Sequence, residues 1–369
     1  MTTPILDAVL DFQKSAQSET FRAWRRWMNA AKVPEIARKV KVATTPHDVV
    51  YEEDSLKLLR YKNEHSIDLK EPVLVCFALV NRPYILDLQP DRSVVRQLLK
   101  RGFDVYLIDW GIPTAADRTL RLEDYVCGFM RNVAKFICSH SESSKVNLLG
   151  YCMGGTMSAM YAALYQEQIK NLILMAAPID FSGDEGLLNV WTRDKYFDVD
   201  GMVDAFGNCP GSFLQSSFQM MKPVQNYVEK YLGFFEKLDE DTFLENFFAM
   251  ERWVNDNIPV AGETFREFVK HLYQQNQLVM GEFKLNDMPV KLQNITCPIL
   301  TLTADYDHLV PPNSTLAIKH YVSSKFIHHM SIHAGHIGLA VSSKAHKQLW
   351  PDAAMWIADH STNVERQRN

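Results

Sequence analysis

The sequence predicts an α/β fold in which a mostly parallel sheet is flanked by helices and interrupted by an inserted helical cap. Apolar, β-branched runs alternate with helical patterns through the first half of this 369-residue chain. The alternation lapses from about residue 182 to residue 288 and resumes near residue 297. Strands that alternate with helices form parallel sheets with right-handed crossovers, so the two outer parts are expected to share one sheet.

Composition narrows the class of protein. The chain is 47% hydrophobic, which suits a large core, and its net charge of -5 arises from both signs spread along the chain. This balance gives no reason to expect nucleic-acid binding. We find neither an apolar run of membrane-spanning length nor a secretion signal, and the six cysteines lack CxxC spacing. A cytoplasmic protein without a transmembrane segment is therefore expected.

Residues 1–45 are predicted to form a separate helical segment. Its apolar surface comes from Phe12, Phe21, Trp24, Trp27 and Met28. Between positions 22 and 41 only Glu35 opposes the basic residues Arg22, Arg25, Arg26, Lys32, Arg38, Lys39 and Lys41. The favoured interpretation is a solvated helix packed on the core, and the alternative is a contact surface for a partner or a granule boundary.

The α/β core is predicted in two parts, residues 46–181 and 291–369, with the cap at residues 182–290 between them. Strands are expected at residues 73–79, 104–110, 146–149, 172–175, 297–303 and 326–330, and helices at residues 93–100 and 122–140. The cap segment is rich in aromatic residues and methionine. Ligands of open α/β sheets bind at the carboxyl ends of the strands, so the cap is expected there.

The most informative motif follows the strand at residues 146–149. It reads Gly-x-Cys-x-Gly-Gly, centres on Cys152, and leads into a helix of small residues. This is the strand–turn–helix context of the nucleophile elbow in the α/β-hydrolase fold, with cysteine in place of serine. Gly150 and Gly154 lack the Cβ atoms that so tight a turn excludes. The start of the following helix favours negative charge on the Cys152 sulfur.

The other five cysteines are expected to pack as small apolar residues, since free cysteine is among the most buried residue types. They are Cys76, Cys127, Cys138, Cys209 and Cys297.

A thiol nucleophile needs a base, and the base needs a group that orients it. In this fold the order along the chain is nucleophile, acid, histidine. Asp305 and Asp307 compete for the acid role, and the Asp-x-x-Val-Pro spacing favours Asp307. His336 lies between Gly335 and Gly338 in a loop, which suits an exposed imidazole.

The backbone is expected to supply the oxyanion hole. The Met153 N–H follows the nucleophile directly, and the Val80 N–H lies in the loop after an early strand. Arg82 in that loop could meet an anionic substrate group, although an arginine on the surface is commoner. No spacing typical of a zinc site occurs, so no metal is expected.

Cysteine also hints at the substrate. Attack of a thiolate on an oxygen ester is uphill, because the product is a thioester. Attack on a thioester replaces one thioester with another, so the acyl group stays activated. The cysteine therefore favours acyl-CoA-type substrates, with coenzyme A as a leaving group and no resident cofactor.

The chain resembles the catalytic subunit of polyhydroxyalkanoate synthases of the short, two-subunit type. The matching segments are residues 77–84, 104–111, 146–155, 204–208, 261–266, 273–276, 307–312 and 335–338. They cover the chain in order from about residue 45 to residue 360. The Gly-Tyr-Cys-Met-Gly-Gly box resembles the class partnered in bacilli (class IV), and much of the rest resembles the class first known from purple sulfur bacteria (class III).

The resemblance implies a role for each matched residue. Cys152 would carry the growing (R)-3-hydroxyacyl chain as a thioester, His336 would take the thiol proton, and Asp307 would promote attack by the 3-hydroxyl group. The resemblance further implies an (R)-3-hydroxyacyl-CoA substrate, a homodimer, a small accessory subunit, and a place on cytoplasmic polyester granules. The cap would cover the site and admit substrate by moving. Residues that bind the rest of the substrate are not identified.

Two other functions remain open at this stage. A cysteine-dependent acyl hydrolase, similar to dienelactone hydrolases or thioesterases, would use the same motif and transfer the acyl group to water. A non-enzymatic granule-surface or scaffold protein would keep only the fold, and the complete set of Cys152, Asp307 and His336 argues against it.

Overall fold

The computed structural model describes residues 4–141, 143–183 and 186–364. The chain divides into two compact units. One combines Met1–Val42 with Gln215–Asn255, and the other combines Ala43–Leu214 with Asp256–Asn369.

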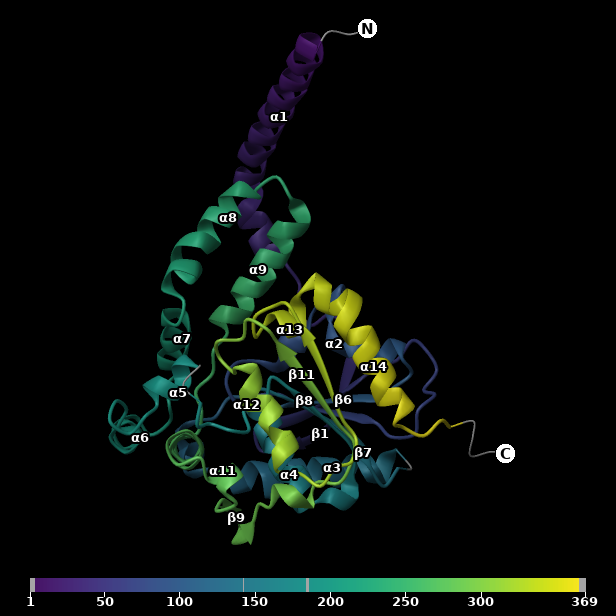
Figure 1. The fold of residues 1–369 in the computed structure, drawn as a ribbon, viewed down its shortest axis with the longest axis vertical. Helices are drawn as coiled ribbons and strands as arrows, with labels where there is room; N and C mark the ends of the chain where they lie inside the picture. Colours follow the sequence, from purple (N-terminus) through teal and green to yellow (C-terminus); the bar gives the residue numbers. More distant parts are fainter. Residues whose placement is uncertain (1–3, 142, 184–185, 365–369) are drawn as a thin grey trace. The chain divides into compact units, whose positions relative to one another are not determined.

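The second unit is built on an eight-stranded sheet (Figure 1). The strands, in spatial order, are β1 (His47–Glu53), β2 (Leu56–Tyr61), β6 (Val105–Asp109), β3 (Val73–Cys76), β7 (Val146–Tyr151), β8 (Ile169–Met175), β11 (Ile299–Ala304) and β12 (Ile327–Ile332). All neighbours from β6 to β12 are parallel, whereas β1 and β2 pair antiparallel with each other and β2 with β6. The predicted α/β-hydrolase architecture, with a mostly parallel sheet, is confirmed.

Helices cover both faces of this sheet, as Figure 1 shows. One face carries α2 (Val94–Lys100), α13 (Gly338–Val341) and α14 (Trp350–Asp359), and the other carries α3 (Met130–His140) and α4 (Met153–Leu164). Because both faces are covered, β3, β7 and β11 are buried at every residue. Such strands appear in the sequence as unbroken apolar runs, which is why they were predictable.

The hairpin of β1 and β2 was not predicted. Its residues are charge-rich and half-exposed, so they carry no apolar run. The two strands meet at Asp54, which has a positive φ of 52°. β2 then pairs with β6, and this long-range pairing stabilises the hairpin in a way that local sequence does not reveal.

The predicted cap, residues 182–290, is mostly helical but belongs to both units. Its helices in the second unit are α5 (Leu187–Trp191), α6 (Val199–Phe206), α10 (Gly262–Glu267) and α11 (Gln277–Met280), and α7 (Gly211–Met220) runs across the boundary. Those in the first unit are α8 (Lys230–Glu236) and α9 (Asp241–Asn255). The boundaries taken from the sequence therefore do not coincide with the two units, and a movable cap stays a prediction.

Shorter elements complete the described chain. They are the strands β4 (Asp87–Gln89), β5 (Arg92–Ser93), β9 (Lys284–Leu285) and β10 (Met288–Pro289), the helix α12 (Pro312–Leu316), the 3₁₀ turns η1 (Pro83–Leu86), η2 (Ala115–Thr119), η4 (Gln166–Gln168), η7 (Leu292–Asn294) and η8 (Ala317–His320), and the π-helical segments η3 (Asp124–Phe129), η5 (Gln225–Glu229), η6 (Phe268–Gln274) and η9 (Ala345–Leu349). The helix predicted at residues 122–140 corresponds to η3 followed by α3.

Within the first unit, the long helix α1 (Pro4–Lys39) packs against α9. The Asn29 Nδ2 donates hydrogen bonds to the Leu238 carbonyl (2.7 Å) and to the Asp241 carboxylate (3.0 Å). Arg26 approaches Asp239 at 3.5 Å. The basic stretch of α1 therefore has acidic partners that lie far away in the sequence.

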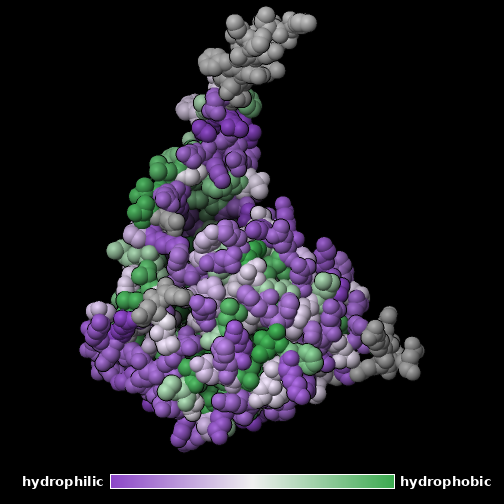
Figure 2. Space-filling view, viewed as in Figure 1, coloured by the Kyte–Doolittle hydropathy of each residue, from purple (hydrophilic) through white to green (hydrophobic). Residues whose placement is uncertain are grey.

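The first unit also exposes apolar side chains, and Figure 2 shows hydrophobic surface over α8 and the segment before it. The exposed apolar residues of this segment are Met220, Val224, Tyr227, Val228, Tyr231, Leu232 and Phe235. On α1, Phe21, Trp24 and Trp27 are more than half exposed. Across residues 4–141, 143–183 and 186–364, no helix combines the length and the apolar character needed to cross a membrane.

Candidate active site

Cys152 lies in a sharp bend between β7 and α4. Its backbone has φ 56° and ψ -129°, a conformation that non-glycine residues rarely adopt. The Cys152 N–H donates to the Met175 carbonyl at the end of β8 (3.0 Å), and the Cys152 carbonyl accepts from the Gly155 N–H (2.8 Å). The bend is thus fixed to the neighbouring strand on one side and to the new helix on the other.

The glycines around the bend have no room for a side chain. A Cβ on Gly150 would lie 2.5 Å from the Gly155 Cα, and a Cβ on Gly154 would lie 2.3 Å from the Cys76 carbonyl oxygen. Both contacts are with backbone, which cannot move aside easily. The sequence argument for glycine at these two positions is confirmed.

His336 and Asp307 meet at the same edge of the sheet, after β12 and β11 respectively. The His336 Nδ1 lies 2.7 Å from the Asp307 Oδ2, with side chains only 10% and 1% exposed. The other carboxylate oxygen of Asp307 accepts from the backbone N–H groups of Leu309 (2.9 Å) and Val310 (2.8 Å). Asp307 is therefore held by three hydrogen bonds, and it orients the imidazole through Nδ1.

Cys152 lies close enough to the His336 imidazole for its charge to act on the ring. Burial opposes protonation of His336, but the charges of Asp307 and Cys152, together with hydrogen bonds to both, outweigh it and raise the pKa of His336 to about 10. The structure therefore joins Cys152, His336 and Asp307 in one chain of interactions.

Tyr151, the residue before the nucleophile, supports the imidazole, a role that sequence reasoning missed. Its ring stacks on His336 with centroids 5.1 Å apart, and its hydroxyl donates to the His336 carbonyl (3.0 Å). Phe77 packs edge-on against Tyr151 at 5.5 Å. The only sequence signal was an aromatic residue inside the elbow motif.

The two backbone groups predicted for an oxyanion hole lie on segments that the structure packs together. Val80 follows β3, and Met153 is the first residue of α4. Gly154 sits directly against the carbonyls of Cys76 and Phe77, so the loop after β3 reaches the start of α4. Within the described residues, neither the Val80 nor the Met153 N–H has a backbone hydrogen-bond partner.

Other candidate residues lie outside this chain of interactions. Asp305 pairs with His333 at 3.4 Å, and both side chains are about half exposed. Arg82 forms an ion pair with Asp109 at 2.8 Å. The structure thus gives both Asp305 and Arg82 partners within the chain.

Among the described residues, neither the other cysteines nor the acidic groups form a second catalytic or metal site. All six cysteines are free; Cys138 is half-buried, whereas Cys76, Cys127, Cys209 and Cys297 are buried. Desolvation raises the pKa of the Cys76 and Cys209 thiols to about 12, so these two are poor nucleophiles. In the described ranges, no group of three or more His, Cys, Asp or Glu residues is arranged to hold a metal ion.

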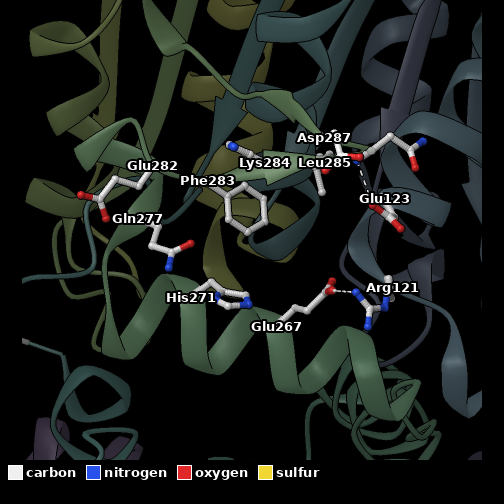
Figure 3. Close-up of a pocket in the computed structure, with 11 residues that line it drawn as sticks. Arg121, Glu123, Glu267, His271, Gln277, Glu282, Phe283, Lys284, Leu285 and Asp287 are labelled. Atoms are coloured by element: carbon white, nitrogen blue, oxygen red, sulfur yellow. Dashed lines mark hydrogen bonds and ion pairs between the residues drawn. The ribbon is translucent and has the colours of Figure 1, made fainter.

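A separate surface pocket of about 300 Å³ lies between the helix of α10 and η6 and the β9–β10 hairpin (Figure 3). Glu267 and His271 line one wall, and Phe283 lines the opposite one. Two of the carboxylates have partners: Glu267 forms an ion pair with Arg121 at 3.4 Å, and Glu123 accepts the Asn286 N–H at 2.8 Å. Burial raises the pKa of Glu267. The triad residues are not among those that line this pocket.

Comparison with known proteins agrees with the fold. Residues 71–342 match the family model of the alpha/beta hydrolase fold, and residues 28–98 match that of the poly-beta-hydroxybutyrate polymerase (PhaC) N-terminus. The second match includes part of α1.

Three curated relatives are similar over most of the chain, and each is a poly(3-hydroxyalkanoate) polymerase subunit PhaC. The protein of Haloferax mediterranei is 44% identical over 97% of this chain and 73% of its own length. That of Synechocystis sp. is 45% identical over 87% and 86%, and that of Allochromatium vinosum is 41% identical over 87% and 90%.

The sequence identities with these three relatives, and the share of each chain that they cover, show the family. The chain belongs to the poly(3-hydroxyalkanoate) polymerase subunit PhaC family, whose members are acyltransferases with an α/β-hydrolase fold.

Proposed function

We propose that this protein polymerises (R)-3-hydroxyacyl units from their coenzyme A thioesters, with the growing polyester held on Cys152. One observation carries the proposal: a cysteine in a strained bend lies beside an imidazole that a buried carboxylate orients. The family membership supports polymerisation as the overall reaction.

The first step is acylation of the cysteine. The Cys152 sulfur attacks the thioester carbonyl carbon, and the oxygen takes up negative charge next to the Val80 and Met153 N–H groups. The bond from the carbonyl carbon to the coenzyme A sulfur then breaks. His336, which holds the cysteine proton, donates it to the departing coenzyme A sulfur, so no proton is gained or lost.

The second step lengthens the chain. The 3-hydroxyl oxygen of an incoming (R)-3-hydroxyacyl-CoA attacks the carbonyl carbon of the thioester on Cys152. A new oxygen ester forms, and the bond from that carbon to the Cys152 sulfur breaks. His336 accepts the hydroxyl proton, because its ring nitrogen is the basic atom that faces the sulfur. The lengthened chain is then a thioester of coenzyme A, and the freed Cys152 sulfur attacks it as in the first step, so that coenzyme A leaves and the chain returns to Cys152.

The geometry supports an orienting role for Asp307 rather than direct contact with the hydroxyl group. Its side chain is 1% exposed, and both oxygens are occupied by His336 and by backbone N–H groups. A carboxylate buried to this degree offers almost no surface to a substrate hydroxyl. This differs from the expectation that Asp307 itself promotes hydroxyl attack.

A cysteine suits this chemistry for a thermodynamic reason. Exchange between two thioesters is nearly balanced, so acylation of Cys152 keeps the acyl group activated for the ester bond that follows. The thioester exchange supports a coenzyme A substrate, and the family membership supports a hydroxyacyl group.

Residues outside the site suggest where partners bind. We propose that the protein works as a homodimer with a small accessory subunit on cytoplasmic polyester granules. The exposed apolar side chains of the first unit support an association of this kind, since large exposed patches are uncommon on monomers. Sedimentation with isolated granules, and the mass of the purified assembly, test these points.

Incubation of the protein with (R)-3-hydroxybutyryl-CoA separates the polymerase from the cysteine acyl hydrolase. We expect release of coenzyme A together with polyester, because the acyl acceptor is a hydroxyacyl group. The Cys152→Ala variant should release neither, since the sulfur is the nucleophile. Free 3-hydroxybutyrate without polymer would contradict the proposal and favour the hydrolase.

Replacing Asp307 with asparagine tests its orienting role. The variant loses the charge that holds the imidazole, so we expect first acylation and elongation to slow by similar factors, each on the order of 10²–10⁴. Rapid-quench measurement of coenzyme A release gives both rates. A loss confined to elongation would show that Asp307 acts on the hydroxyl group instead.

The raised pKa of His336 makes stability depend on pH. Because the pKa rises from 6.5 to about 10 on folding, the stabilisation is complete below pH 6.5 and is lost as pH rises to about 10. Chemical denaturation should therefore show the largest difference in unfolding free energy between wild type and His336→Gln near pH 6. His65→Gln makes the same change at an exposed site and should stay within about 0.5 kcal/mol of wild type. A His336→Gln difference that grows with pH would be inconsistent with the ion pair.

A further inference from the structure

The loop after β3, residues 77–82, lies between the nucleophile bend and the end of β6. In the sheet, Cys76 at the end of β3 is in register with Gly150 of β7 on one side and with Ile108 of β6 on the other. A Cβ on Gly154, at the start of α4, would lie 2.3 Å from the Cys76 carbonyl oxygen. The position of this loop therefore decides which of its backbone groups can face the bend.

Two side chains from the end of β6 hold the loop at its two ends. The Trp110 Nε1 donates to the Phe77 carbonyl at the start of the loop (3.0 Å), and this hydrogen bond is buried. The Arg82 guanidinium donates to the Asp109 Oδ2 at the end of the loop (2.8 Å), with side chains 22% and 17% exposed. Val80, whose N–H is the predicted oxyanion donor, lies between the two attachment points.

The Asp109 carboxylate is itself held in place. Its Oδ1 accepts the Gly111 N–H at 3.0 Å, which leaves Oδ2 for Arg82. Gly111 has a positive φ of 75°, and a Cβ there would lie 2.2 Å from the Ser55 carbonyl oxygen in the turn between β1 and β2. The end of β6 is therefore closely packed, and it gives Arg82 a fixed anchor.

The loop depends on such an anchor because its backbone is strained. Asn81, between Val80 and Arg82, has a positive φ of 69°. Non-glycine residues in this region cost free energy, persist only where the surrounding structure holds them, and cluster at functional sites. Without the ion pair to Asp109, the chain at Asn81 can relax, and the neighbouring Val80 N–H turns with it.

We propose that Arg82 is a positioning residue: its ion pair with Asp109 holds the Val80 N–H where it donates to the thioester oxygen as that oxygen gains negative charge. This inference rests on the proposed function. A donor in an oxyanion hole acts mainly in the transition state, so its displacement lowers kcat more than it weakens substrate binding. The alternative, that Arg82 binds an anionic group of the substrate, predicts a higher KM instead.

The test measures kcat and KM for coenzyme A release from (R)-3-hydroxybutyryl-CoA. Arg82→Met keeps most of the aliphatic side chain but removes the ion pair. Removal of one oxyanion donor costs about 10²–10³ in kcat, so we expect its displacement to lower kcat about 10-fold to 100-fold. We expect KM to stay within about twofold. Arg82→Lys, whose ammonium can still pair with Asp109, should recover most of the lost kcat.

Arg60→Met is the matched control. Arg60 pairs with Asp104 through two hydrogen bonds of 3.0 Å, just before β6 begins and thus at the opposite end of this strand. The control removes an ion pair from the same strand without touching the loop after β3, so we expect kcat and KM to stay within about twofold of wild type. Chemical denaturation shows whether each variant is folded.

Three results would overturn the inference while the proposed function stands. A higher KM at unchanged kcat would mean that Arg82 contacts the substrate. Unchanged values in Arg82→Met would mean that the ion pair does not position the loop. Equal losses of kcat in Arg82→Met and Arg60→Met would reflect a general loss of structure.

If Arg82→Met does not fold, Asp109→Asn takes its place, and it should likewise lower kcat at unchanged KM because the carboxylate charge is lost. An unchanged kcat in that variant would contradict the inference. If the wild type itself released no coenzyme A from (R)-3-hydroxybutyryl-CoA, the proposed function would fail, and the inference with it.

Discussion

The backbone of Cys152 is the constraint on which the site depends. A non-glycine residue at positive φ costs on the order of 1–3 kcal/mol, so the surrounding structure has to hold it there. Hydrogen bonds to the end of β8 and from the first turn of α4 do so, and the close packing of Gly150 and Gly154 leaves no alternative path for the chain. The bend places Cys152 and the Met153 N–H together at the start of α4.

The remaining groups reach the sulfur from loops at the carboxyl ends of other strands. Asp307 and His336 follow β11 and β12, and the Val80 loop follows β3. Tyr151 stacks on His336, and Phe77 packs against Tyr151. Strand ends and packed rings thus position the sulfur and the imidazole with little freedom of movement.

Sequence patterns predicted the elements of the fold and the site that depend mainly on residues close together in the sequence. The buried strands are apolar runs because helices cover both faces, and the bend carries glycines because a Cβ would strike backbone. The β1–β2 hairpin depends on pairing with β6, and the association of α1 with residues 215–255 depends on Asn29 and Arg26 meeting distant groups. Tyr151 was likewise not singled out as part of the site, since nothing in a single sequence shows which tyrosine stacks on the histidine.

The central claim is that one sulfur carries the product while it grows. Mass spectrometry of protein quenched during turnover of a limited amount of (R)-3-hydroxybutyryl-CoA tests it most directly. The account predicts that the peptide containing Cys152 carries the added mass of one or more 3-hydroxybutyryl units, bound as a thioester that hydroxylamine removes. Coenzyme A release with the acyl mass on another residue, or with no acylated peptide at all, would contradict it.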